Sequence, residues 1–241
     1  MNADKDTDVN LDVLPIKESK DSLMPVSYPI TDNLPATPFF MTITAPVKSG
    51  KSVLIGNLLL RFYPNAWDSI YYFSPTAEMC KTTKSFLKAY EDSDQDITIM
   101  CKHEDLLNID TYIELICEEQ RRTKQEERKK ILFVLDDIIG YKLKRLNFLA
   151  SRYRHYNITT LIAVQSYRKL DPIMRVNCSC SVFFKVANQK EMGKIEEELL
   201  ENIPGYLDYY NTATAKRYDF LFFDIQQQRL FHNFHTLLWE K

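Results

Sequence analysis

The sequence lacks any uninterrupted apolar run of about 18 residues, the length from which a helix can span a bilayer. Its first 22 residues, MNADKDTDVNLDVLPIKESKDS, are acidic and polar and contain no apolar core of a secretion signal. Cysteine is scarce and never forms a CxxC pair, and the closest two have no histidine at metal-ligand spacing. We therefore expect a protein that is not secreted, has no transmembrane segment and keeps reduced thiols. The five cysteines are Cys80, Cys101, Cys117, Cys178 and Cys180.

The overall charge is also small, but it is unevenly distributed. A formal charge of −2 on 241 residues does not indicate a general nucleic-acid binder. No acidic residue occurs between Ile138 and Leu170, however, and a local positive surface can contact a polyanion whatever the total charge. A solvated helix face is an equally good explanation for any single lysine there. The basic residues of this window are Lys142, Lys144, Arg145, Arg152, Arg154, Arg168 and Lys169.

Hydrophobic patterning divides the chain into an arm and one folded unit. Residues 1–35 have no hydrophobic period, contain scattered prolines and carry an excess of acids, so we expect an extended acidic arm. Residues 36–241 alternate short apolar runs with amphipathic segments, which predicts an α/β fold with a mainly parallel sheet flanked by helices. Near the C-terminus, YDFLFFDIQQQRLFHNFH predicts two strands joined by a polar turn, a β-hairpin. The predicted parallel strands lie in PFFMTITA, SIYYFSP, DITIMCK, ILFVLDD, ITTLIAVQS and SVFFKVA.

The first of these strands leads into the segment APVKSGKS, which matches the phosphate-binding pattern G-x-x-x-x-G-K-[ST] except that Ala45 replaces the first glycine. In such a loop the backbone amides and the following helix N-terminus face phosphates. Lys51 would reach the β- and γ-phosphates of ATP, and the Ser52 hydroxyl would bind Mg²⁺. The predicted nucleotide-binding residues are Ala45, Pro46, Val47, Lys48, Ser49, Gly50, Lys51, Ser52 and Val53.

Polar side chains end two further apolar strands. Asp136 follows ILFVL, where a carboxylate at the C-terminal end of a parallel strand can hold Mg²⁺. Asp137 is placed to orient or deprotonate an attacking water. Gln165 ends the next apolar strand, where an amide can contact the γ-phosphate and the same water. Each feature alone could be an ordinary strand exit, but together with the loop they predict a hydrolytic nucleotide site.

Arginines close to the Gln165 strand could act on a neighbouring subunit. Arg152 and Arg154 directly precede that strand, and an arginine at a subunit boundary can stabilise transferred charge in trans. Arg175, in DPIMRVNC, is the alternative for this role.

The segments APVKSGKS, ILFVLDD and SRYRHYNITTLIAVQSYRKLDPIMRVNCS resemble the poxvirus-type genome-packaging ATPases of large DNA viruses and virophages, in the HerA–FtsK branch of P-loop ATPases. The resemblance covers about residues 37–186. It implies an additional-strand, RecA-like fold and an ATP- and Mg²⁺-dependent translocase that packages viral double-stranded DNA into a preformed capsid.

The same resemblance assigns residues and partners. It gives Gln165 the sensor role and Arg154 the role of the arginine before the sensor strand, and it matches Asp136 and Asp137 to the metal-binding acidic pair. It further implies a ring of five or six copies, a capsid or portal-vertex protein as partner, and a location at viral assembly sites in the host cytoplasm or in the virion. The basic window described above, rather than the resemblance, supplies the DNA-contact candidates Lys142, Lys144 and Arg145.

Two other functions fit parts of the sequence. The loop and QSYRK could belong to a small-molecule kinase such as a nucleoside kinase, which hydrolysis assays with DNA or nucleosides would distinguish. Ala45 and Pro46 are compatible with an assembly protein that binds nucleotide without hydrolysing it. That protein would need Lys51 but not Asp137.

Overall fold

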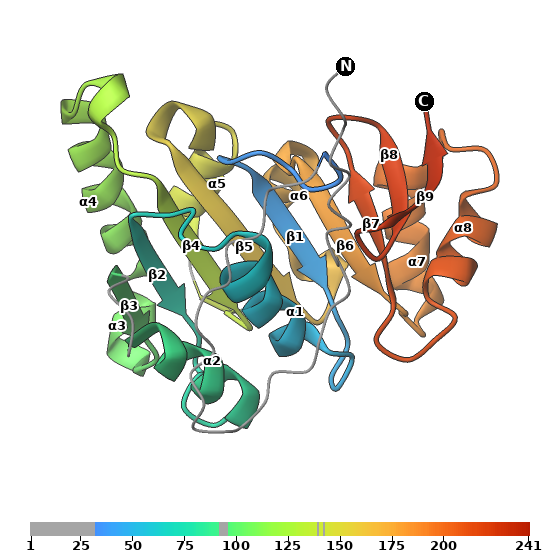
Figure 1. The fold of residues 1–241 in the computed structure, drawn as a ribbon, viewed down its shortest axis with the longest axis horizontal. Helices are drawn as coiled ribbons and strands as arrows, with labels where there is room; N and C mark the ends of the chain where they lie inside the picture. The colour runs from blue at the N-terminus through green and yellow to red at the C-terminus, as the bar shows by residue number, and fades with distance from the viewer. Residues whose placement is uncertain (1–31, 92–95, 139, 142) are drawn as a thin grey trace, which may run out of the picture.

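The computed structural model describes residues 32–91, 96–138, 140–141 and 143–241. Within them a nine-stranded sheet runs in the order β3-β2-β4-β5-β1-β6-β7-β8-β9 (Figure 1). The strands from β3 to β6 in this order are parallel, and β7, β8 and β9 continue the sheet in antiparallel fashion. The bounds are β1 Phe40–Thr44, β2 Ser69–Phe73, β3 Asp96–Met100, β4 Ile131–Asp136, β5 Ile158–Val164, β6 Cys180–Phe184, β7 Phe220–Asp224, β8 Arg229–His232 and β9 Thr236–Glu240.

The predicted α/β fold with a C-terminal hairpin is confirmed, and the sequence reading missed only the last strand, β9. The strand that leads into the phosphate loop, β1, does not pair with β4, which ends in Asp136. Instead β5 lies between them and pairs with both. This inserted strand is the additional-strand arrangement that the family resemblance implied.

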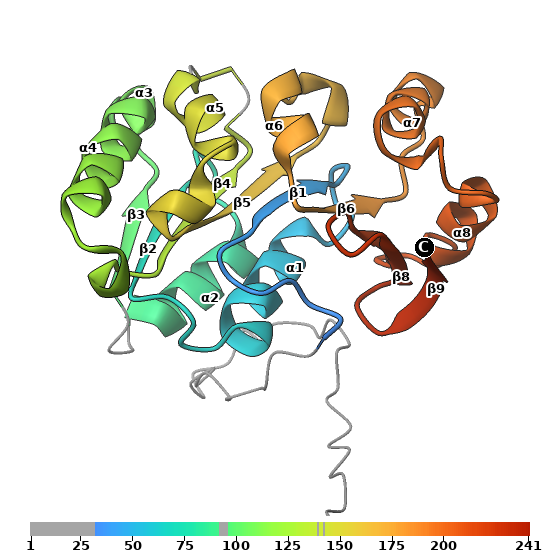
Figure 2. The same ribbon diagram turned by 90° about the horizontal axis from the view of Figure 1, so that it is seen from above.

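Helices cover both faces of the sheet, as the end-on view shows (Figure 2). Helices α1 and α2 lie on one face, whereas α4, α5, α6 and α7 lie on the other. The helix bounds are α1 Lys51–Asn57, α2 Lys81–Glu91, α3 His103–Leu107, α4 Ile109–Arg122, α5 Lys144–Ala150, α6 Pro172–Asn177, α7 Gln189–Ile195 and α8 Tyr206–Ala213. Single π-helical turns extend α1 over Leu58–Phe62 and α7 over Glu196–Leu200, and short 3-10 turns cover Gln125–Glu127, Tyr153–Tyr156 and Tyr167–Lys169.

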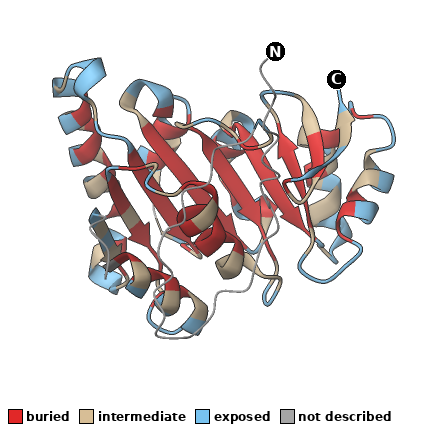
Figure 3. Cartoon of the chain, viewed as in Figure 1, coloured by how far each residue is buried: buried red, intermediate tan, exposed pale blue. Residues whose placement is uncertain are grey.

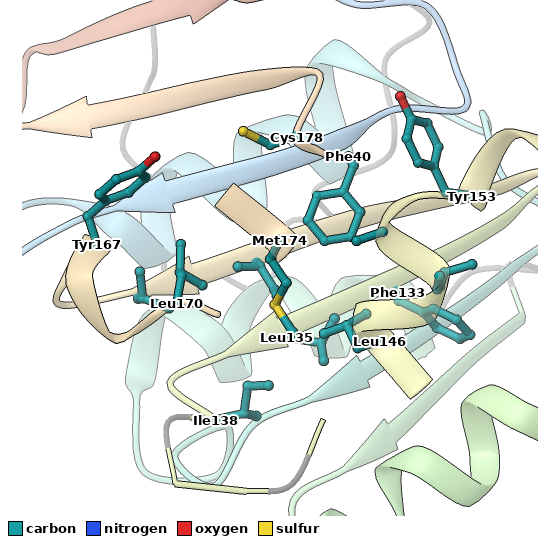
Figure 4. Close-up of a cluster of buried hydrophobic side chains, with 14 of the residues drawn as sticks. Phe40, Phe133, Leu135, Ile138, Leu146, Tyr153, Tyr167, Leu170, Met174 and Cys178 are labelled. Atoms are coloured by element: carbon teal, nitrogen blue, oxygen red, sulfur yellow. The ribbon is translucent and has the colours of Figure 1, made fainter. Parts of the chain in front are cut away.

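The central strands are buried along their whole length, which is why they read as continuous apolar runs (Figure 3). Their alternating side chains supply two cores. Phe133 and Leu135 of β4 pack with Leu146 and Met174 on the face covered by α5 and α6 (Figure 4). Leu132 and its neighbours on the opposite face pack under α1 and α2. Full burial of such a side chain contributes about 1.5–3 kcal/mol, so these layers hold the strand ends rigidly in place.

The folded unit begins slightly before the predicted boundary at residue 36. Leu34 is buried in the core under α1, and the Tyr63 hydroxyl donates to the Pro35 carbonyl at 2.7 Å. The sequence missed this because a single leucine among prolines gives no periodic signal. Residues 1–31, the greater part of the predicted arm, lie outside the described residues. Within the described ranges, none of the helices combines the length and apolarity needed to cross a membrane.

Candidate nucleotide-binding site

The predicted phosphate loop connects the end of β1 to the start of α1. Ala45 is buried, and its N–H donates to the Val164 carbonyl of β5 at 2.9 Å. The loop turns where Ser49 N–H donates to the Pro46 carbonyl at 3.2 Å. Its left-handed residues are Lys48, with φ 63°, and Gly50, with φ 105°. Alanine in place of the first glycine therefore introduces no left-handed strain, because residue 45 is not in that region.

Lys51 joins the loop to the acidic end of β4. Its ammonium lies 2.8 Å from Asp136 Oδ1 and also forms an ion pair with Asp137 Oδ2. Asp137 takes a left-handed conformation, φ 56°, directly after the strand, and aspartate tolerates this better than most residues. One lysine thus bridges two consecutive carboxylates at the edge of the sheet.

Burial makes the Asp136 carboxyl unusual. It is almost fully buried, and burial raises its pKa above the ordinary value although the nearby Lys51 ammonium acts in the opposite direction. The Tyr72 hydroxyl donates to Asp136 Oδ2 at 3.2 Å. Burial, and then the charge of Asp136, raise the pKa of Tyr72 well above its usual range, so this hydroxyl stays protonated and remains a donor.

Gln165 lies beside the same carboxylates. It follows β5 directly, and its side-chain amide donates to Asp137 Oδ1 at 3.4 Å. The register pairs Asp136 with Ala163 and Thr44 with Val164, so the ends of β4, β5 and β1 meet at one edge. The sequence prediction that Lys51, Asp136, Asp137 and Gln165 converge matches this arrangement.

These side chains surround an open cavity of about 480 Å³. That volume is within the range of about 300–1,000 Å³ for small-molecule sites. Of the nine predicted loop residues, only Ser49 does not line it. The cavity also contains residues that the sequence reading did not single out, namely Thr76, Cys80, Thr82, Arg217 and Tyr218.

A magnesium ion fits the oxygen donors of this cavity. Asp136 Oδ1 is buried and has Lys51 as its ion-pair partner, so a cation there would offset the cost of the buried charge. Ser52 offers a hydroxyl from the first turn of α1. The described residues contain no group of three metal-ligating side chains, but Mg²⁺ needs only one or two protein ligands when phosphates and water complete its shell.

The arginines before β5 lie at the opposite edge of the sheet from the cavity. The Arg152 guanidinium stacks 4.2 Å from the Phe148 ring centroid, and Arg154 Nε donates to the Tyr153 hydroxyl at 3.2 Å. Both side chains are exposed. The seven residues of β5 separate them from Gln165 by roughly 20 Å, so neither arginine can reach the cavity of its own chain.

Arg175 is held inside the chain, which argues against the trans role considered for it. It is 7% exposed, and its Nε and Nη2 lie 2.8 and 3.0 Å from the two carboxylate oxygens of Glu198. Its Nη1 donates to the Leu170 carbonyl at 2.8 Å. The guanidinium therefore has a structural role that ties α6 to the turn after α7. An arginine that contacts a neighbouring subunit in trans needs a side chain that extends from the surface of its own subunit.

The basic window is only partly free to contact a polyanion. Lys142 lies outside the described residues, while Lys144 and Arg145 begin α5. Both backbone N–H groups donate to the Asp110 carboxylate at 2.9 Å, and the Arg145 guanidinium pairs with Glu114. Lys144 is exposed and makes no described ion pair, so it is the better DNA-contact candidate of the two.

A P-loop NTPase is defined by a strand, a glycine-lysine-serine loop and the helix that follows, together with an acidic strand end. Here that strand, β4, is separated from β1 by β5. Within that class the chain belongs to the family described as Poxvirus A32 protein, whose model matches residues 29–203. No match was found among curated proteins.

Solved structures with a similar fold come from viral and bacterial ATPases. The DNA-packaging ATPase B204 of Sulfolobus turreted icosahedral virus has a TM-score of 0.58 at 17% identity, covering 81% of this chain and 97% of its own. The genome-packaging NTPase B204 of Sulfolobus turreted icosahedral virus 2, in complex with AMPPCP, gives 0.55 at 18% identity, with 80% and 95% coverage. The cytoplasmic domain of the type VII secretion ATPase EccC of Thermomonospora curvata gives 0.52 at 14%, with 77% and 24% coverage. At these identities the likeness establishes the fold.

Proposed function

We propose that this chain is an ATP-driven translocase that packages viral double-stranded DNA into a preformed capsid. The observation that carries the proposal is the meeting of Lys51, Asp136, Asp137 and Gln165 around one cavity behind a phosphate loop. Membership of the Poxvirus A32 family, and the fold shared with viral packaging NTPases, support the packaging role.

The ion pairs of Lys51 suggest how nucleotide binding prepares hydrolysis. Its ammonium forms ion pairs with both carboxylates, which leaves one negative charge uncompensated. The β- and γ-phosphates of a bound triphosphate would compete for the same ammonium, and Asp136 and Ser52 are the residues that would hold a Mg²⁺ ion. That ion would neutralise charge on the phosphates.

Release of Lys51 also frees Asp137. The Asp137 carboxylate would then accept a proton from the attacking water, while Gln165, already within 3.4 Å of Asp137, would orient that water. The water oxygen would bond to the γ-phosphorus as the bond from the bridging oxygen to the γ-phosphorus breaks, and ADP would leave with the bridging oxygen. Asp137 is shorter than a glutamate, so the water must sit close to the strand end or be bridged to it. The site therefore stays inactive until phosphate occupies it.

We extend the proposal to a homo-oligomeric ring of five or six copies on the DNA. Because Arg152 and Arg154 lie at the edge of the sheet remote from their own cavity, they fit a contact with the next subunit's nucleotide. Lys142 and Lys144 would grip the DNA backbone without regard to sequence. The acidic residues that precede Leu34 would form an arm, and a capsid or portal-vertex protein at assembly sites in the host cytoplasm or in the virion would be the partner.

The first test is ATP hydrolysis by the purified full chain, with and without long linear double-stranded DNA. We expect DNA to stimulate hydrolysis, and Asp137→Asn to abolish the stimulated rate while leaving ATP binding intact. Lys51→Ala should abolish both. Stimulation by nucleosides instead of DNA would indicate a small-molecule kinase. ATP-dependent assembly that survives Asp137→Asn would indicate a non-hydrolysing assembly protein.

A second test concerns the grip on DNA. The double variant Lys142→Ala/Lys144→Ala leaves the Arg145–Glu114 pair in place. We expect it to lower the DNA-stimulated rate more than the basal rate, and to reduce the salt dependence of DNA binding by about 1 to 2 units of slope. Lys129→Ala, an exposed lysine just before β4 at the other edge of the sheet, is the matched control. Equal loss of both rates would remove the assignment.

A further inference from the structure

The nucleotide cavity has a second wall, made by the loop between α8 and β7. Arg217 and Tyr218 of this loop line the same cavity as Lys51, Ser52 and Asp136, although they lie far away in the sequence. The other sides come from the phosphate loop, the ends of β4 and β5, and the segment that leads from β2 into α2. No pattern in the sequence points to these two residues, because the fold alone brings them to the loop.

Tyr218 packs directly on the phosphate loop. A Cβ atom at Gly50 would lie 3.3 Å from Tyr218 Cδ1, which is closer than about nine in ten contacts of this kind. Tyr218 itself has φ 75°, in the left-handed region that an aromatic residue seldom adopts. Strained conformations of this kind persist only where surrounding structure holds them, and they concentrate at ligand sites. The residue is nevertheless 53% exposed, so it is not simply part of the core.

Arg217 brings a positive charge to this wall. Its guanidinium lies 4.7 Å from the centroid of the Tyr218 ring, at cation–π distance. The side chain is exposed, and the described residues give it no carboxylate partner. The cavity it borders already holds Lys51, whose charge is neutralised by two aspartates. Lys48 of the phosphate loop also lines the cavity and is exposed. A triphosphate carries several negative charges, so a third cation beside these two lysines would add to the attraction.

The loop is fixed by the C-terminal strands, next to the two residues it presents. Asp219 Oδ2 lies 2.8 Å from His232 Nε2, and the Asn233 side-chain amide donates to Asp219 Oδ1 at 3.4 Å. Asn233 Oδ1 in turn accepts from Phe220 N–H at 3.1 Å. The turn between β8 and β9 therefore sets where Arg217 and Tyr218 stand relative to Gly50.

We propose that Arg217 contacts the phosphate chain of the nucleotide bound by its own chain, and that Tyr218 is the positioning residue that holds the guanidinium over the phosphate loop. This proposal rests on the proposed function and adds to it a cation supplied in cis. The C-terminal strands then have a specific role, which is to position the loop between α8 and β7 at the nucleotide site.

The test is binding of a fluorescent ATP analogue to the full chain in the presence of Mg²⁺, with unlabelled ATP, ADP and inorganic tripolyphosphate as competitors. Because Arg217 would form charge-assisted hydrogen bonds to the phosphates, we expect Arg217→Ala to weaken the binding of both ATP and tripolyphosphate by about 10- to 100-fold. Arg217→Lys should restore part of the loss. Lys216→Ala, an exposed neighbour that does not line the cavity, is the matched control and should stay within about twofold.

The role of Tyr218 is tested by comparing ATP binding of two variants, one that keeps the aromatic ring and one that removes it, at a temperature well below the unfolding temperature. Tyr218→Phe keeps the ring and should bind ATP as the wild type does, whereas Tyr218→Ala should lose severalfold in affinity. Equal losses in both variants would contradict a positioning role of the ring.

Lys51→Ala, measured in parallel, separates this proposal from the proposed function. Loss of ATP binding in Lys51→Ala with no loss in Arg217→Ala would overturn the role of Arg217 alone. Weaker ATP binding in Arg217→Ala with unchanged tripolyphosphate binding would overturn the phosphate contact in favour of the base or ribose. Absence of nucleotide binding by the wild type would overturn both proposals.

Discussion

The buried carboxyl of Asp136 allows a test in which stability and activity change in opposite directions. Burial raises its pKa, so the ionised form is less favourable in the folded chain than in the unfolded chain, despite Lys51. Asp136→Asn removes the charge and keeps the size of the side chain. Lys51 retains its second partner, Asp137. We therefore expect Asp136→Asn to stabilise the nucleotide-free protein while abolishing Mg²⁺-dependent hydrolysis.

The expected increase in the free energy of unfolding of Asp136→Asn is small but measurable. Replacing buried ion pairs by neutral groups of similar volume has stabilised proteins by about 1–4 kcal/mol. Because only one member of the Lys51 cluster is neutralised here, we expect the low end, about 1 kcal/mol. For a chain of this size that corresponds to a rise in Tm of about 2–4 °C. Asp137→Asn, a more exposed neighbour in the same cluster, is the control and should not raise Tm.

The stability difference between Asp136→Asn and the wild type should depend on pH, and the direction of that dependence follows from the raised pKa of Asp136. An acid whose folded pKa is raised binds its proton more tightly in the folded state, so this group stabilises the protein as pH falls through the folded pKa. The Tm difference between Asp136→Asn and the wild type should therefore be largest near neutral pH and shrink as the pH falls toward the ordinary carboxyl range. Thermal unfolding between pH 8 and pH 5 measures it. A variant that unfolds below the wild type at neutral pH would refute the reasoning.

Two further substitutions test parts of the fold that support the site. Arg175→Met should lower stability by about 3 kcal/mol in thermal unfolding, since it leaves the carboxylate of Glu198 partly unpaired. Loss of hydrolysis without loss of stability would instead restore Arg175 as a trans arginine. Gly50→Ala should cost about 1–2 kcal/mol and weaken ATP binding, because φ is 105° and the Tyr218 ring occupies the space. Gly193→Ala, in α7 with nothing within 4 Å, should instead raise the unfolding temperature slightly.

The sequence predicted which polar side chains lie together at the C-terminal ends of the strands, for a physical reason. Parallel strands buried on both faces read as apolar runs, and their C-terminal ends all meet at one edge. Asp136, Asp137 and Gln165 could therefore be placed beside the loop from their positions alone. The substitution at Ala45 could be judged only from the structure, which puts the left-handed backbone at Lys48 and Gly50.

The features that escaped prediction depend on contacts between distant segments. Arg217 and Tyr218 reach the cavity because Asp219 is bound by the turn between β8 and β9. The strand β9 was missed because the polar residues around it resemble a loop. Arg175 looked available in the sequence, and only its contact with Glu198 reveals that it is internal. Periodicity and motif spacing carry no information about such pairings.

Strand β5 connects two places that would act at different times. It is seven residues long and buried throughout, with Arg152 and Arg154 just before it and Gln165 just after it. In the proposed ring, its beginning would sense the neighbour's nucleotide and its end would contact its own. Because β5 is buried and paired on both sides, we expect strain at one of its ends to be transmitted to the other. Successive subunits would then hydrolyse ATP in order around the ring, because each β5 strand would couple the nucleotide state of the neighbouring site to that of its own site.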